Sequence, residues 1–181
     1  RHKTPPQSWP VFCTGLDMKV LAFDPYIAPD LFRRHEAEPV ETLIEAASQC
    51  DILSVHVPLN HETRGMIDSD IFKHMKPGSC IINAARGGII NESDLLQALD
   101  DGHIAKAAID TFEHEPSPLP ELLKHQNIYV TPHMGASTTE AQIAIGSTIY
   151  DQVIKAVERG VVDYPVNLPE VGIIDRPILK T

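Results

Sequence analysis

Short apolar runs that alternate with helix-like segments constrain the fold of this chain more than any other feature. The runs predict strands at Lys19–Asp24, Asp51–Val57, Ser79–Asn83, Ala105–Asp110 and Asn127–Thr131. Helical spacing occurs at Val40–Gln49, Ser69–Met75, Asn91–Leu99 and Ser137–Arg159. This alternation indicates βαβ units and a parallel sheet, and the near-continuous apolarity indicates strands buried on both sides. We therefore expect an α/β fold with helices on both faces of the sheet.

Composition narrows the class of protein. The 181 residues are enough for one domain with its own core. A net charge of −10 argues against a nucleic-acid partner, which needs a basic surface. No apolar run reaches the roughly 20 residues of a membrane helix, and residues 1–6 contain no apolar segment of a secretory signal. Cys13, Cys50 and Cys80 form no metal-binding pair and are expected to be reduced thiols of a cytoplasmic protein.

Polar and turn residues stand at or just beyond five predicted strand ends. These positions are Asp24, Val57–Pro58, Asn83–Arg86, Asp110 and Thr131–His133. Ligand sites of parallel α/β sheets lie outside the carboxyl ends of the strands. The five positions are therefore the candidate site.

Arg86 follows a predicted strand and precedes two glycines, which permit a close approach of the backbone. A guanidinium group in this position can grip a substrate carboxylate through two hydrogen bonds. The alternative is an arginine in a salt bridge at the rim of the sheet. The local sequence leaves both interpretations open.

His133 is the candidate acid–base group. Oxidising a secondary alcohol requires a base for the hydroxyl proton, and a histidine beside a carboxylate suits this near neutral pH. Glu113 and Glu115 both stand in the Asp110–Pro116 stretch, and their context does not decide between them. The other eight histidines are expected to be structural or superficial.

Two aspartates are candidates for cofactor contacts. Asp24 ends a predicted strand, where an acid can accept the ribose hydroxyls of a dinucleotide and repel the 2′-phosphate of NADP. The alternative is a turn-forming aspartate before Pro25. Asp110 is either a second cofactor contact or a cap.

The Asn83–Gly88 turn, the Asp110–Pro116 stretch and the Pro132–Thr138 segment, with their spacing, resemble one known domain. It is the nucleotide-binding domain of the D-isomer-specific 2-hydroxyacid dehydrogenases, and the resemblance is greatest to the D-3-phosphoglycerate dehydrogenase branch. It extends from about Gly15 to Pro169. We therefore expect a Rossmann-like sheet in an NAD-dependent oxidoreductase that acts on the CH–OH group of a small D-2-hydroxy acid, or on the 2-keto acid. A 3-phosphoglycerate-like or a glycerate/hydroxypyruvate-like substrate is implied.

The resemblance also implies roles for individual residues. Arg86 would bind the substrate carboxylate, His133 would be the acid–base group, and Glu115 rather than Glu113 would be its partner. A homodimer is implied for the full-length family, and no metal. NAD contacts are implied at Asp24, Val57, Pro58, Ala84, Ala85, Arg86, Asp110, His133, Gly135 and Ala136.

The front of the chain departs from the resemblance. A dinucleotide-binding fold begins with a strand, a GxGxxG turn and a helix, with the glycines about 20 residues before the ribose-binding acid. Counting back from Asp24 reaches residues 1–6, which contain no glycine. We therefore expect a sheet that lacks its first strand and glycine-rich loop. The predicted parts are a non-family segment (1–14), an incomplete NAD-binding domain (15–160) and an extended tail toward an absent substrate domain (161–181).

The missing loop has two expected consequences. Trp9–Thr14 cannot replace the first strand in parallel, because only four residues separate it from Lys19 and a parallel connection needs about a dozen. It should pair antiparallel or stay outside the sheet. NAD should bind weakly or not at all, because the pyrophosphate lacks its helix N-terminus.

Two classes of function follow. One is a dehydrogenase of 2-hydroxy acids, which Arg86, Glu115 and His133 favour. The other is a non-catalytic fragment or a binding module like the corepressors that resemble the same family, which the absent glycine loop favours.

Overall fold

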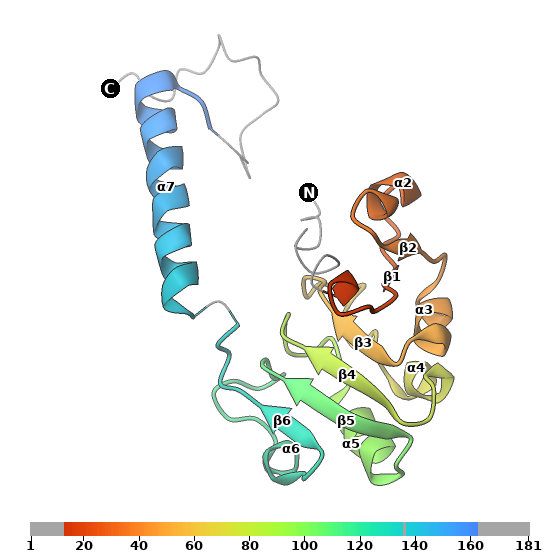
Figure 1. The fold of residues 1–181 in the computed structure, drawn as a ribbon. Helices are drawn as coiled ribbons and strands as arrows, with labels where there is room; N and C mark the ends of the chain where they lie inside the picture. The colour runs from red at the N-terminus through yellow and green to blue at the C-terminus, as the bar shows by residue number, and fades with distance from the viewer. Residues whose placement is uncertain (1–12, 136, 163–181) are drawn as a thin grey trace. The chain divides into compact units, whose positions relative to one another are not determined.

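A computed structural model describes residues 13–135 and 137–162 of the chain (Figure 1). The chain divides into two compact units, Arg1–His133 and Met134–Thr181. Each unit is described by itself. The predicted tail falls largely on residues 163–181, outside the described residues.

A parallel four-stranded sheet forms the centre of the first unit. Its strands follow chain order, and all neighbours pair in parallel (Figure 1). They are β3 (Ile52–Val55), β4 (Ser79–Asn83), β5 (Ile104–Ile109) and β6 (Ile128–Val130). The α/β parallel sheet predicted from the apolar runs is thereby confirmed, with each strand within two residues of its expected bounds.

A second, two-stranded parallel sheet precedes the first. It pairs β1 (Leu21–Ala22) with β2 (Glu38–Pro39), and the short helix α2 (Pro29–Arg33) connects the two strands in the chain. The predicted strand at Lys19–Asp24 is therefore shorter than expected, and neither α2 nor β2 was predicted. Among the described residues, no strand joins the two sheets.

Four helices connect the strands of this unit. They are α3 (Leu43–Gln49), α4 (Ser69–His74), α5 (Glu92–Asp100) and α6 (Pro120–Lys124). Side-chain caps fix three of their starts: Thr42 accepts from the backbone N–H of Glu45, and Asp68 and Asn91 each cap two N–H groups. These caps satisfy donors that a helix leaves unpaired in its first turn. The helix predicted at Asn91–Leu99 is confirmed, whereas α6 was not predicted.

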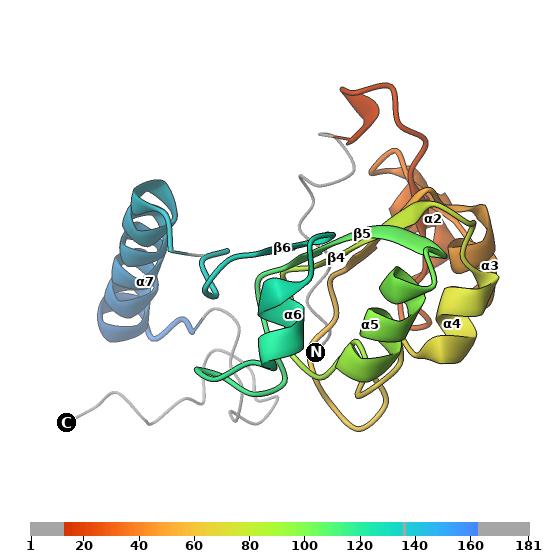
Figure 2. The ribbon, with the colours of Figure 1, turned by 90° about the horizontal axis from the view of Figure 1, so that it is seen from below.

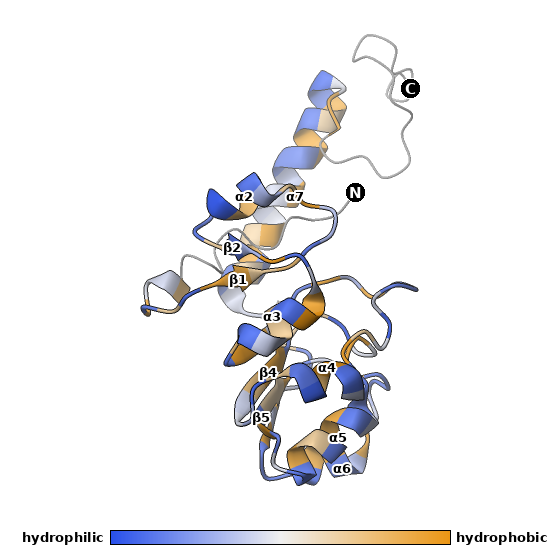
Figure 3. Ribbon diagram, turned by 90° about the vertical axis from the view of Figure 1, so that its right-hand side faces the viewer, coloured by the Kyte–Doolittle hydropathy of each residue, from blue (hydrophilic) through white to orange (hydrophobic). Residues whose placement is uncertain are grey.

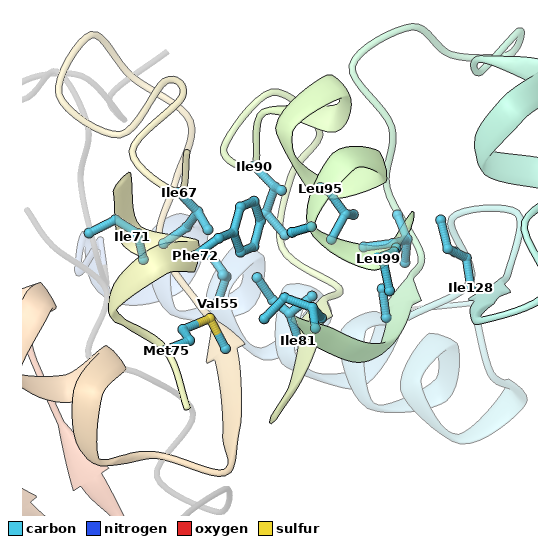
Figure 4. Close-up of a cluster of buried hydrophobic side chains, with 14 of the residues drawn as sticks. Val55, Ile67, Ile71, Phe72, Met75, Ile81, Ile90, Leu95, Leu99 and Ile128 are labelled. Carbon is cyan, nitrogen blue, oxygen red and sulfur yellow. The ribbon is translucent and has the colours of Figure 1, made fainter. Parts of the chain in front are cut away.

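The helices α4, α5 and α6 lie on one face of the four-stranded sheet (Figure 2). Between them and the strands lies the core, which includes Phe72, Ile81, Ile89, Leu95 and Ile104, all nearly inaccessible to solvent (Figure 4). Burial of such side chains supplies most of the folding free energy, about 1.5–3 kcal/mol each. The packed core thus holds the strands, and with them the strand ends, in fixed positions.

The other face of this sheet carries a shallow, mostly apolar groove. Its lining includes Ile52, Cys80, Lys106 and Tyr129, and the ammonium group of Lys106 lies 5.8 Å from the centre of the Tyr129 ring. The described helices that pack on the sheet within this unit lie on the opposite face, so helices on both faces remain a prediction.

The described part of the second unit is dominated by the 21-residue helix α7 (Thr139–Arg159). Thr138 caps its first turn through the N–H of Ala141, and Gly160 ends it in a left-handed conformation. The helix predicted at Ser137–Arg159 is thereby confirmed. Apolar and polar residues alternate along it (Figure 3). None of its residues is buried.

One predicted segment is only partly described. Cys13 and Thr14 are helical, whereas Trp9–Phe12 lie outside the described residues. The expectation of a segment outside the sheet therefore holds for Cys13 and Thr14 alone.

Candidate active site

The carboxyl ends of β3, β4, β5 and β6 point to the same edge of the sheet (Figure 1). Backbone hydrogen bonds continue past the strands at this edge. The N–H of Asp110 donates to the carbonyl of Asn83 at 2.9 Å, and the N–H of His133 donates to the carbonyl of Asp110 at 2.9 Å. The residues that follow three strands are therefore held in one row.

Asn83 shapes the turn that carries Arg86. Its side chain is almost fully buried. The amide nitrogen donates to the carbonyl of Arg86 at 2.9 Å, while the amide oxygen accepts from the N–H of Ala85 at 3.0 Å. One buried amide thus closes the turn on both sides. These bonds fix the backbone of Arg86, whose side chain is exposed.

Glu115 and His133 form the central pair of the site. Oε2 of Glu115 lies 2.8 Å from Nδ1 of His133, and Oε1 accepts from the N–H of Phe112 at 2.9 Å. These two hydrogen bonds lower the pKa of Glu115 below its ordinary value, and the bond from His133 has the larger effect. Glu115 is therefore ionised near neutral pH and accepts a hydrogen bond from the Nδ1–H group of His133. This leaves Nε2 as the unprotonated nitrogen of a neutral imidazole.

The backbone of His133 is constrained as well. Its φ of 53° lies in the left-handed region, which non-glycine residues rarely enter, although His and Asn do so more often than most. The hydrogen bond from its N–H to Asp110 helps to hold this conformation. Such residues cluster at functional sites, where the surrounding structure fixes them.

The structure separates the two candidate glutamates. Glu115 contacts His133, whereas Oε1 of Glu113 lies 3.9 Å from a guanidinium nitrogen of Arg64. The backbone N–H of Glu113 donates to the carboxylate of Glu92 at 2.7 Å. Of the two glutamates, Glu115 is thus the one that contacts His133, and its catalytic role stays a prediction.

Arg86 is not joined to this pair by any hydrogen bond or ion pair found among the described residues. Its guanidinium donates to the carbonyl of Ala85 at 2.6 Å. It stands on the turn after β4, at the same sheet edge as the pair.

The predicted cofactor contacts occupy several elements. Asp24 follows β1 in the smaller sheet, where its carboxylate accepts from the N–H of Tyr26 at 2.9 Å. Asp24 therefore does form a turn, and its carboxylate can still accept further hydrogen bonds. Val57 and Pro58 follow β3, and the carbonyl of Pro58 accepts from the hydroxyl of Thr63 at 2.6 Å.

The remaining predicted contacts fall on the turn, on Asp110 and beyond His133. Ala84 is exposed and Ala85 half-buried. The carboxylate of Asp110 is buried and accepts from the hydroxyl of Thr131 at 2.5 Å, so it braces the ends of β5 and β6. Gly135 is exposed in the second unit, and Ala136 lies outside the described residues.

Asn83, Glu92 and Thr131 support the site. Asn83 and Thr131 were predicted among the residues at the strand ends but without a role of their own, and each bonds to a site residue. Glu92, which bonds to the backbone of Glu113, was not predicted. A polar residue at the end of an apolar strand was the available signal for Asn83 and Thr131. Glu92 gave no such signal, because acids are common in the first turn of a helix.

The fit to a dinucleotide is partial. Asp24 offers a carboxylate for ribose hydroxyls, and the row at the sheet edge offers polar groups for the nicotinamide end. The 181 residues contain no GxGxxG sequence, and no described helix begins with one. The pyrophosphate part therefore does not fit the described residues. No group of three or more His, Cys, Asp or Glu suited to a metal ion occurs among them.

A parallel α/β sheet with polar residues gathered beyond the carboxyl ends of its strands is the arrangement of the class of dinucleotide-binding domains. Residues 9–135 match the family described as "D-isomer specific 2-hydroxyacid dehydrogenase, NAD binding domain". The chain belongs to this family, as the three motifs predicted, and NAD is the cofactor of the family domain.

Relatives and solved structures agree with this assignment. The D-3-phosphoglycerate dehydrogenase of Archaeoglobus fulgidus is 40% identical over 160 residues, which are 88% of this chain and 30% of that protein. The holo D-mandelate dehydrogenase of Rhodotorula graminis is similar with a TM-score of 0.73 and 32% identity, covering 81% of this chain and 43% of that one.

A third similarity is to the NADPH-dependent glyoxylate/hydroxypyruvate reductase of Sinorhizobium meliloti in complex with NADP and malonate. Its TM-score is 0.76 at 25% identity, covering 87% of this chain and 48% of that one. The chain thus spans about a third of the curated relative and less than half of the solved chains. None of the described helices is long and apolar enough to cross a membrane.

Proposed function

We propose that this chain carries the acid–base part of an NAD-dependent dehydrogenase of D-2-hydroxy acids. The observation that carries the proposal is the hydrogen bond of 2.8 Å between Glu115 and Nδ1 of His133. It leaves Nε2 as the base. Glycerate-like acids, with or without a phosphate, and the corresponding 2-keto acids are the proposed substrates, in line with the names of the relatives.

The proposed chemistry divides into proton and carboxylate handling. NAD, when bound, supplies the acceptor for the hydride that leaves C2 of the hydroxy acid. Nε2 of His133 takes the hydroxyl proton as the carbonyl forms, and Glu115 stabilises the resulting imidazolium. Arg86 binds the substrate carboxylate through its two-pronged guanidinium and so orients C2.

The proposed cofactor contacts are those implied by the resemblance. Asp24 would bind the ribose. The resemblance implies further NAD contacts at Val57, Pro58, Ala84, Ala85, Arg86, Asp110, His133, Gly135 and Ala136. We also propose a cytoplasmic homodimer, which the free thiols of Cys13, Cys50 and Cys80 and the exposed apolar residues of α7 support.

The test is NADH oxidation with hydroxypyruvate or phosphohydroxypyruvate, followed in the spectrophotometer. His133→Asn is the informative variant, because asparagine tolerates the left-handed backbone while lacking a base. We expect it to lower kcat by at least about 100-fold, and Arg86→Lys to raise KM for the keto acid. His61→Asn, at a highly exposed histidine, is the control.

Equal rates for wild type and His133→Asn would overturn the proposed role of His133. A wild-type chain without turnover would favour the second candidate, a non-catalytic binding module of the same fold. The sequence feature that favours this alternative is the absence of any GxGxxG sequence in the 181 residues.

A further inference from the structure

The segment that carries Glu115 is short and is held by contacts with two residues, Gly87 and Glu92. Phe112–Glu115, here called the strap, leaves β5 through Asp110 and Thr111. Gly87 supports it on one side: a Cβ atom at this position would lie 1.8 Å from the carbonyl oxygen of Phe112. The backbone of the strap therefore rests directly on the turn that carries Arg86.

Glu92 is the second support of the strap. It is the first residue of α5 and only 7% exposed. Its Oε1 accepts from the N–H of Glu113 at 2.7 Å. The helix N-terminus favours a carboxylate here, whereas burial raises the pKa of Glu92. The hydrogen bond from Glu113 opposes that rise.

Two backbone N–H groups of the strap donate to carboxylates, and their partners differ. The N–H of Phe112 binds Oε1 of Glu115, within the strap. The N–H of Glu113 binds Glu92, outside it. The ion pair between Arg64 and Glu113 is long and half-exposed, so it holds the strap weakly. Glu92 is thus the hydrogen-bond acceptor that ties the strap to a helix.

We propose that Glu92 is a positioning residue that places Glu115 against His133 by fixing the peptide of Glu113. The inference rests on the proposed function only where it concerns catalysis, because the geometry of the pair can be measured without turnover. Among the described residues, Glu92 has no hydrogen bond or ion pair with His133 or Glu115, and its side chain accepts from the N–H of Glu113. Its effect passes through the strap, two residues from the carboxylate that meets the base.

Asp94 offers a matched comparison. It also lies in the first turn of α5 and also accepts a backbone hydrogen bond, from the N–H of Ser69 at 2.9 Å. That bond ties α5 to the start of α4 and does not involve the strap. Removing either carboxylate removes one first-turn acid and one backbone acceptor. Only the loss of Glu92 should release Glu115.

The experiment is NMR of the labelled chain, with the side-chain carboxyl of Glu115 titrated by its ¹³C shift and Nδ1 of His133 followed by its ¹⁵N shift. We expect Glu92→Ala to raise the pKa of Glu115 by at least about 0.5 pH units and to move the His133 signal. Glu92→Gln keeps an acceptor oxygen and should restore most of the wild-type behaviour. Asp94→Ala should leave both signals unchanged, although its Tm should fall below that of the wild type, as the Tm of Glu92→Ala should.

The proposal is overturned if Glu92→Ala leaves the Glu115 and His133 signals at their wild-type positions, or if Asp94→Ala moves them equally. Should Glu92→Ala fail to fold, Glu92→Leu, which fills the buried site without an acceptor, takes its place. Where the wild-type chain turns over, kcat in Glu92→Ala should fall about tenfold with KM for NADH unchanged. A wild-type chain without turnover counts against the proposed function alone, because the NMR signals do not depend on it.

Discussion

The site is assembled from single buried polar side chains that each hold a piece of backbone. Asn83 closes the Arg86 turn, and Asp110 braces Thr131. A buried polar group without a partner costs about 1–3 kcal/mol, so each of these side chains requires its partner to stay in place. The positions of Arg86 and His133 therefore depend on residues that need not touch a substrate.

Glu115→Gln should make the free energy of unfolding less dependent on pH. The hydrogen bonds from His133 and from the N–H of Phe112 lower the pKa of Glu115, while partial desolvation and Asp110 oppose this. The folded state thus favours the ionised form over an unfolded chain with a pKa of about 4.3. The stabilisation is present above that pH and is lost as the pH falls through the folded pKa.

Urea unfolding at a series of pH values measures the effect. The glutamine variant should be less stable than wild type near neutral pH, and the two should converge in strong acid. Glu41→Gln, at an exposed carboxylate outside the site, is the control and should show no such convergence. A gap between wild type and Glu115→Gln that stays constant down to strong acid would contradict the assigned pairing.

At the scale of elements, periodicity sufficed where an element was long or capped. The β4 strand at Ser79–Asn83 matched its apolar run, and α7 matched the segment between Thr138 and Gly160. The two-residue strand β2 and the five-residue helices α2 and α6 span too few residues for a period to show. The row at the sheet edge was predictable because parallel strands share one edge, whereas the anchoring by Glu92 depends on a tertiary contact.

The helix α7 carries an apolar face that a homodimer would cover. Ile149, Val153 and Val157 follow one another at helical spacing and are each more than half exposed. A charge on this face should therefore weaken association, since burying an unpaired charge is unfavourable. We expect Val153→Glu to shift the chain toward monomer at a given concentration. Sedimentation velocity measures the shift.

Thr148→Glu introduces the same side chain about 140° around the same helix. It should leave the sedimentation profile unchanged. A wild-type chain that is monomeric at all concentrations would remove the support that α7 gives to the proposed dimer. Equal effects of the two substitutions would show that the charge acts without regard to the face.

At the scale of the whole first unit, the parallel strands form two sheets instead of one. β1 and β2 pair with each other, and β3 pairs only with β4 among the described strands. In a doubly wound sheet the strand that carries the glycine-rich turn is central. It would lie between the strands that correspond to β1 and β3. The division thus falls where a phosphate-binding strand would lie. Asp24 and the Glu115–His133 pair follow strands on opposite sides of this division.

This division predicts weak NAD binding by the 181-residue chain. A pyrophosphate is held mainly by backbone N–H groups at a glycine-rich helix N-terminus, and no GxGxxG sequence occurs in the chain. Asp24 and the sheet-edge row offer contacts to the two ends of the cofactor only. We therefore expect calorimetric titration to give a Kd for NAD above about 1 mM, with little difference between wild type and Asp24→Ala. A micromolar Kd that Asp24→Ala weakens at least tenfold would show that the described residues bind the dinucleotide without such a loop.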